Sequence, residues 1–107
     1  MRMAEYQSVF VVAPSKEVAE KIARALVEEK LAACVNILAG ARSIYRWKGK
    51  VEAANEVVLI AKSRSDLFER LEKRAKQLHP YECPCIVAWP IEKGHQPYLD
   101  WIKQETS

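Results

Sequence analysis

The chain has 107 residues, half of them hydrophobic and 29% charged, which fits one globular domain over residues 1–107 and excludes a disordered chain. Its formal net charge of +3 comes from 17 basic and 14 acidic residues that are interspersed, so we expect no nucleic-acid partner. No apolar run is long enough to cross a membrane, and three cysteines without a recognisable signal peptide predict free thiols in the cytoplasm.

The first third of the chain predicts a strand followed by an amphipathic helix. Residues 6–12 are rich in β-branched and aromatic side chains, which favours a buried strand. Ser15 is a good helix N-cap. Apolar residues then recur every four positions and predict one buried stripe, at Val18, Ile22 and Leu26. The β-branched run that begins at Val35 indicates that the chain turns near Lys30.

A long hairpin is predicted over residues 34–62. Gly40 lies inside its first extended segment, where a glycine indicates a bulge or a bend. Residues 48–50 are typical of a tight turn. Strands of a dozen residues reach about 40 Å at roughly 3.3 Å per residue, so the tip should project beyond the rest of the domain.

The last third predicts a helix, a strand and a short terminal helix. Ser63 and Asp66 have the spacing of a capping box, with aspartate in place of glutamate. The predicted helix then runs to Pro80, and a buried strand follows over residues 85–91. The buried face of the helix should comprise Leu67, Leu71, Ala75 and Leu78. The terminal helix should carry Tyr98, Trp101 and Ile102 on one side.

The predicted order is β-α-β-β-α-β plus a terminal helix, an α+β chain of ferredoxin-like type with strand order 4-1-3-2 or its reverse. Both main helices would then cover one face of the sheet. Apolar neighbours such as Val11 and Val12, or Leu59 and Ile60, point to opposite faces, so the second face should be apolar too. One copy of the chain cannot cover it, and we therefore expect a homo-oligomer.

Several motifs appear in a familiar order along the chain. They are EKLAACVN from Glu29, SIYRWKGK from Ser43, Lys62, HPY from His79 and PYLDW from Pro97. Together they closely resemble the CutA family, the divalent-cation tolerance proteins, from about Ser8 to Trp101. The resemblance implies a ferredoxin-like subunit and a homotrimer whose three sheets face inward, similar in architecture to the PII signalling proteins. It also implies a role in tolerance of copper and other divalent metals in bacteria, whereas animal members are linked to acetylcholinesterase anchoring. It implies no catalysed reaction.

His79 is the first candidate metal ligand, because the family has a proposed copper-ligating histidine at this place. Two further ligands proposed in a bacterial branch are replaced here by Val11 and Leu78. Cys83 and Cys85 could compensate, since thiolates are soft ligands and residues two apart on an extended chain point the same way. The alternatives are structural. His79 could cap the helix C-terminus, and the cysteines could be ordinary packing residues. Cys34 is expected to be such a packing residue.

A second candidate site is a cleft between subunits for a small anion or polar ligand. Its predicted residues are Tyr45, Trp47, Lys50, Lys62, Tyr81, Tyr98 and Trp101. The alternative is that these aromatic residues seal a subunit interface.

Three functions follow from these sites. The first is a metal-binding homotrimer for divalent metal tolerance, with copper or another divalent ion as its cargo. The second is a PII-like signalling trimer that binds a small metabolite, and the third is a scaffold for a partner protein. We do not expect an enzyme, because no nucleophile-and-base set or phosphate loop is recognisable in the sequence.

Overall fold

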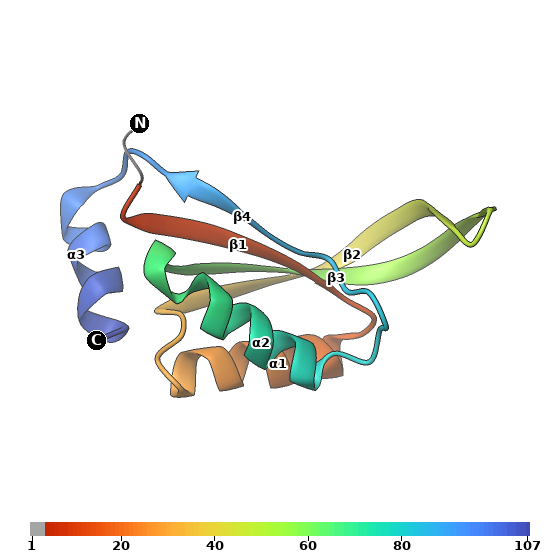
Figure 1. The fold of residues 1–107 in the computed structure, drawn as a ribbon, viewed down its shortest axis with the longest axis horizontal. Helices are drawn as coiled ribbons and strands as arrows, with labels where there is room; N and C mark the ends of the chain where they lie inside the picture. The colour runs from red at the N-terminus through yellow and green to blue at the C-terminus, as the bar shows by residue number, and fades with distance from the viewer. Residues whose placement is uncertain (1–3) are drawn as a thin grey trace.

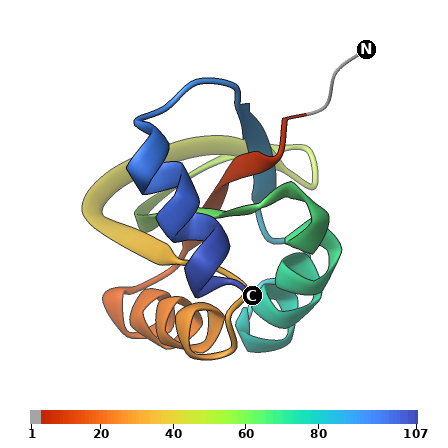
Figure 2. The ribbon, with the colours of Figure 1, turned by 90° about the vertical axis from the view of Figure 1, so that its left-hand side faces the viewer.

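The computed structural model describes residues 4–107 as a twisted four-stranded sheet with two helices on one face and a third helix across one end (Figures 1 and 2). The elements follow the predicted order. They are β1 (Tyr6–Ala13), α1 (Lys16–Glu28), β2 (Cys34–Trp47), β3 (Lys50–Arg64), a 3-10 turn (Ser65–Leu67), α2 (Phe68–Leu78), β4 (Ile86–Ile91) and α3 (Gln96–Glu105).

The sheet is antiparallel throughout, and its strand order is β2-β3-β1-β4. This is the predicted order read in reverse. Each β-α-β crossover therefore skips one strand position, which places α1 and α2 together on the same face (Figure 1). The two crossovers interleave, so residues from both halves of the chain line the same edges and ends of the sheet.

The core lies between this face of the sheet and the two helices. β1 contributes Val9 and Val11, β3 contributes Leu59, and the helices contribute the fully buried Ile22, Leu26 and Leu71. A smaller second cluster under α3 joins Tyr6, Ala33 and Ile102. The predicted stripes of both helices are thus confirmed, with Val18 and Leu78 packed at the margin of the core.

The end of α1 confirms the predicted turn near Lys30. Lys30 adopts a left-handed φ of 59°, and the amides of Leu31 and Ala32 both donate to the carbonyl oxygen of Leu26, at 2.8 and 3.1 Å. A residue of this conformation ends a helix because it reverses the chain while it satisfies the last carbonyl groups.

The predicted capping box before α2 is wrong. Ser63 is still part of β3 and is fully buried, and its hydroxyl donates to the carbonyl oxygen of Leu31 at 2.5 Å. The α-helix begins only at Phe68, after the 3-10 turn. The hydroxyl is engaged across the core by the loop after α1, which is a tertiary contact that local spacing does not reveal.

The β2–β3 hairpin projects well beyond the helices, as predicted (Figure 1). Gly40 has a φ of +89°, and the register between the two strands shifts between Leu38 and Ala41. The glycine therefore forms the predicted bulge, which increases the local twist and redirects the distal half of the hairpin.

The face of the sheet that the helices leave open is apolar, also as predicted. Phe10 lies opposite Ile60 on β3 and Val87 on β4, and its ring meets that of Trp89 edge to face at 5.4 Å. Val87 and Trp89 are 47% and 53% exposed. Leu38 extends this apolar area onto β2. Within residues 4–107, none of the helices combines the length and the apolar character that crossing a bilayer requires.

Candidate ligand pocket and thiol pair

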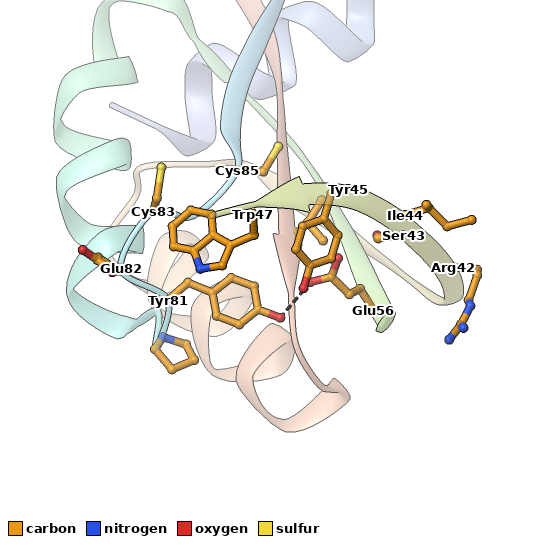
Figure 3. Close-up of a pocket in the computed structure, with 12 residues that line it drawn as sticks. Arg42, Ser43, Ile44, Tyr45, Trp47, Glu56, Tyr81, Glu82, Cys83 and Cys85 are labelled. Carbon is orange, nitrogen blue, oxygen red and sulfur yellow. Dashed lines mark hydrogen bonds between the residues drawn. The ribbon is translucent and has the colours of Figure 1, made fainter. Parts of the chain in front are cut away.

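A pocket of about 860 Å³ lies between the projecting hairpin and the loop that joins α2 to β4 (Figure 3). We call it the hairpin pocket. Tyr45 and Trp47 enter it from β2 and Glu56 from β3, and Tyr81, Cys83 and Cys85 enter it from the loop. Arg42 and Glu82 lie further out (Figure 3). The bulge at Gly40 immediately precedes the hairpin residues of this pocket, so the bend it introduces sets their position.

Glu56 is the buried charged group of this pocket, with 7% of its surface exposed. One carboxylate oxygen accepts a hydrogen bond of 2.8 Å from the hydroxyl of Tyr81 (Figure 3). Removal of the hydroxyl from water, together with this bond and the charge of Glu56, raises the pKa of Tyr81 to about 12. Tyr81 therefore stays protonated, and a hydrogen-bond donor, at neutral pH.

His79 lies at the C-terminal end of α2, is 7% exposed, and uses both of its ring nitrogens. The backbone amide of Tyr81 donates to Nδ1 at 3.1 Å, so Nδ1 is an acceptor. Nε2 must then carry the proton, and it donates to the carbonyl oxygen of Val12 at 2.7 Å. The imidazole ties the α2–β4 loop to β1, and no lone pair is left for a metal ion.

Cys83 and Cys85 are both exposed free thiols on the wall of the hairpin pocket. Burial and, to a lesser extent, the charge of Glu56 raise the pKa of Cys85. The predicted convergence of both thiols with His79 is not found. In the part of the chain that the structure describes, no three His, Cys, Asp or Glu side chains are grouped closely enough to hold a metal ion. A single subunit thus offers at most a pair of thiol ligands and no complete site.

Within one subunit, the residues of the predicted cleft between subunits lie at two ends of the molecule. Tyr45, Trp47 and Tyr81 line the hairpin pocket. Tyr98 and Trp101 contact each other on α3, with ring centroids 5.5 Å apart. The two lysines are outside the pocket as well.

Lys62 lies on the open sheet face, where its ammonium group donates to Asn36 and its neighbour in the ladder is Cys34. Cys34 is half-buried rather than part of the core, and burial and this thiol raise the pKa of Tyr98. Lys50 belongs to the exposed end of the hairpin.

Sequence reasoning missed Glu56, the residue around which the pocket is arranged. The available signal was an acidic residue directly before the apolar run at Val57–Ile60. A carboxylate at the edge of a buried strand needs a partner, so that position could have been singled out.

A comparison of the chain with protein-family models identifies its family. The model described as CutA1 divalent ion tolerance protein matches residues 7–105. The chain belongs to the CutA1 family. The resemblance read from its motifs is thereby confirmed.

Relatives from distant organisms share much of this CutA1 sequence. The chain is 52% identical over 98 residues to the divalent-cation tolerance protein CutA of Thermus thermophilus, a match that covers 92% of this chain and 95% of the relative. It is 46% identical over 99 residues to protein CutA of Mus musculus, with 92% of this chain covered. The match covers 56% of the mouse protein, so the chain spans little more than half of that relative.

Solved CutA1 structures have the same fold. The structure of the divalent cation tolerance protein (Cut A1) from Thermus thermophilus superposes with a TM-score of 0.93 at 50% identity, over 95% of this chain and 99% of that one. A CutA structure from Archaeoglobus fulgidus, described as periplasmic, also gives a TM-score of 0.93, at 45% identity over 95% of this chain and 99% of its own. The small α+β fold is therefore shown for this family member.

Proposed function

We propose that this chain acts in divalent-cation tolerance as a homotrimer of ferredoxin-like subunits that binds a soft metal ion, such as copper, through Cys83 and Cys85. The observation that carries the proposal is the pair of exposed thiols, one residue apart, on the wall of a pocket that also holds a buried carboxylate. Thiolates are the ligands that soft ions such as Cu(I) prefer. The proposal is for binding without catalysis.

The apolar face of the sheet supports the homotrimer. Phe10, Val87 and Trp89 lie on this face, opposite the helices, and an apolar area of this kind is normally covered in a soluble protein. Three sheets that face inward would cover it. Light scattering of the full chain at micromolar concentration should give about three times 12.2 kDa, and a clean monomer would contradict the assembly.

Metal titration tests the thiol pair. Tag-free protein is titrated with Cu(I), Cu(II) and Zn(II) against a competing chelator. The double variant Cys83→Ser, Cys85→Ser should lose at least about tenfold in affinity for the ion that binds most tightly, because a serine hydroxyl is a hard and weak ligand. Cys34→Ser is the matched control, since Cys34 lies outside the pocket.

His79→Gln is a second control, because glutamine keeps a donor for the carbonyl oxygen of Val12. Its metal affinity should equal that of the wild type, because the imidazole nitrogens are already engaged. Equal affinity of the wild type and the double cysteine variant would overturn the thiol assignment. We place the protein in the cytoplasm, where exposed thiols such as these stay reduced.

The hairpin pocket supports a second function, the binding of a small metabolite as in the PII-like hypothesis. Its volume of about 860 Å³ is within the range of ligand sites, and it combines aromatic walls with a few polar groups. A thermal-shift screen in the presence of a metal chelator tests it, because a ligand that binds only the folded state raises the melting temperature. A screen without any hit would count against it.

A further inference from the structure

The carboxylate of Glu56 lacks a positively charged partner within its own subunit. None of the four ion pairs within residues 4–107 includes it, although only 7% of the residue is exposed. A carboxylate has about four lone-pair sites, and the hydroxyl of Tyr81 fills one of them. Glutamate is almost never buried unless it is paired. The remaining oxygen sites face a pocket, so the missing partner can be a ligand.

The surroundings of Glu56 favour a cation as that partner. Tyr45 lines the same pocket as Glu56, and Figure 3 shows the hydroxyl of Tyr81 pointing at the carboxylate. Aromatic rings attract cations through their negative faces. Trp47 already interacts in this way with Lys48, whose ammonium nitrogen is 5.8 Å from the ring centroid, so Tyr45 and Tyr81 are the rings that remain for a ligand.

The other charged groups of the pocket do not pair with the carboxylate of Glu56. The guanidinium group of Arg42 lies apart from Glu56 (Figure 3) and donates to the side chain of Asn55 at 3.1 Å. Glu82 lies at the outer edge of the pocket lining, and its exposed carboxylate points outward (Figure 3). Lys62, the cation expected to attract an anion, lies on the open sheet face instead. An anion would therefore be repelled by the buried carboxylate of Glu56, whereas a cation would be attracted by it.

Tyr81, which donates the hydrogen bond to Glu56, is also held in a fixed position. The amide of Tyr81 is bonded to His79, whose imidazole is bonded to the carbonyl oxygen of Val12 on β1. The rings of His79 and Tyr81 also contact each other, with their planes tilted by 53° and their centroids 4.8 Å apart. A pocket whose polar groups are positioned in advance loses less entropy when a ligand binds.

We propose that the hairpin pocket binds a small organic ammonium ion, with the Glu56 carboxylate as its counter-ion and the rings of Tyr45 and Tyr81 beside it. This proposal rests on the second function above, that the pocket takes a small ligand. It adds the charge of that ligand, which is opposite to the one predicted from Lys62.

Three aromatic probes of similar size and different charge test the proposal on the full chain in its native assembly. They are benzylamine, which is a cation at neutral pH, benzyl alcohol, which is neutral, and benzoate, which is an anion. Binding is measured by calorimetry and by thermal shift with a metal chelator present. Benzylamine should bind at least about tenfold more tightly than either of the others, because its ammonium group forms a charge-assisted bond with the carboxylate.

Two substitutions locate the site. Glu56→Gln should weaken benzylamine binding by about tenfold or more and leave benzyl alcohol unaffected. Glu82→Gln is the matched control, because Glu82 is an exposed acid of the same pocket, and it should change binding less than twofold. The double variant Cys83→Ser, Cys85→Ser should still bind benzylamine, which separates this ligand from the metal ion.

Three results would overturn the proposal: equal binding of the three probes, a Glu56→Gln variant that binds as the wild type does, or no binding of benzylamine at millimolar concentration. The charge preference is measured on the wild type, so it holds even if Glu56→Gln fails to fold. If anionic or neutral metabolites bind the pocket and benzylamine does not, the small-ligand function stands and the ammonium proposal falls. If no compound of any charge binds, both fall.

Discussion

At the scale of single residues, a short chain of hydrogen bonds connects the core to the pocket. It runs from the carbonyl oxygen of Val12 through His79 and Tyr81 to Glu56. Each group has one role that its partners fix: the imidazole is neutral, the phenol is a donor and the carboxylate is an acceptor. His79 therefore holds the loop of the pocket in position, whereas the proposed ligands would contact Glu56 and the two thiols.

The first prediction concerns the pH dependence of stability. The pKa of Tyr81 is raised from 10.0 to about 12 in the folded chain, so the unfolded chain loses this proton first as the pH rises. The stabilisation is complete below pH 10 and is lost between about pH 10 and 12. In metal-free buffer, the melting temperature of Tyr81→Phe should fall less than that of the wild type between about pH 10 and 12.

Tyr45→Phe is the control, at the other tyrosine of the pocket. Its melting temperature should fall at alkaline pH as much as that of the wild type does. A near-ultraviolet titration of phenolate absorbance gives an independent measure. If all tyrosines of the folded chain ionise together at their ordinary pKa, the hydrogen bond between Tyr81 and Glu56 is not present in solution.

At the scale of elements, the projecting hairpin determines whether a pocket exists at all. The two strands are regular up to Leu38, and the register shift at the bulge then redirects the distal part that carries Tyr45, Trp47 and Ala41, the ladder partner of Glu56. The bulge depends on one residue with a backbone conformation that side chains disfavour. The position of the pocket walls is therefore sensitive to Gly40.

The second prediction is that Gly40→Ala lowers the free energy of unfolding by about 1–2 kcal/mol. The cost comes from the backbone alone, because an added Cβ atom would meet nothing within 4 Å. Urea unfolding followed by circular dichroism measures it. Gly40→Asn should lose less, since asparagine tolerates a positive φ better than alanine. Equal losses for the two variants would show that strain at φ +89° is not the cause.

At the scale of the whole molecule, one face of the sheet is buried by helices and the other is exposed. The helices bury the first face, and the second presents Phe10, Val87 and Trp89 next to a few polar groups such as Lys62. The proposed trimer covers this second face with the same face of two other copies. The hairpin pocket would then lie near a subunit boundary, where a ligand or a metal ion could depend on the assembly.

The third prediction tests this arrangement with a charge on the open face. Trp89→Glu should reduce the molar mass in light scattering from about three times 12.2 kDa towards 12.2 kDa, because an unpaired carboxylate in an apolar interface costs several kcal/mol. Val27→Glu is the matched control. Val27 is 42% exposed on α1, away from the open face, and its substitution should leave the mass unchanged. An unchanged mass for Trp89→Glu would place the subunit contact elsewhere.

The order of the elements, the strand order and the apolar second face could be predicted from the sequence, because alternation along strands and four-residue spacing along helices are local properties. The helix stripes, the turn at Lys30 and the bulge at Gly40 follow from the same local rules. Motifs also sufficed to identify the family.

The folded chain sets which side chains contact one another. It engaged both nitrogens of His79 and used Ser63 across the core instead of at a helix end. Within one subunit it separated Lys62 and Tyr98 from Trp47, and it brought the hydroxyl of Tyr81 into contact with Glu56. The contacts of Glu56 with Tyr81 and of His79 with Val12 join residues 25 and 67 positions apart. These contacts form because folding buries each polar group next to a hydrogen-bond partner. Spacing along the sequence does not show which partner that will be.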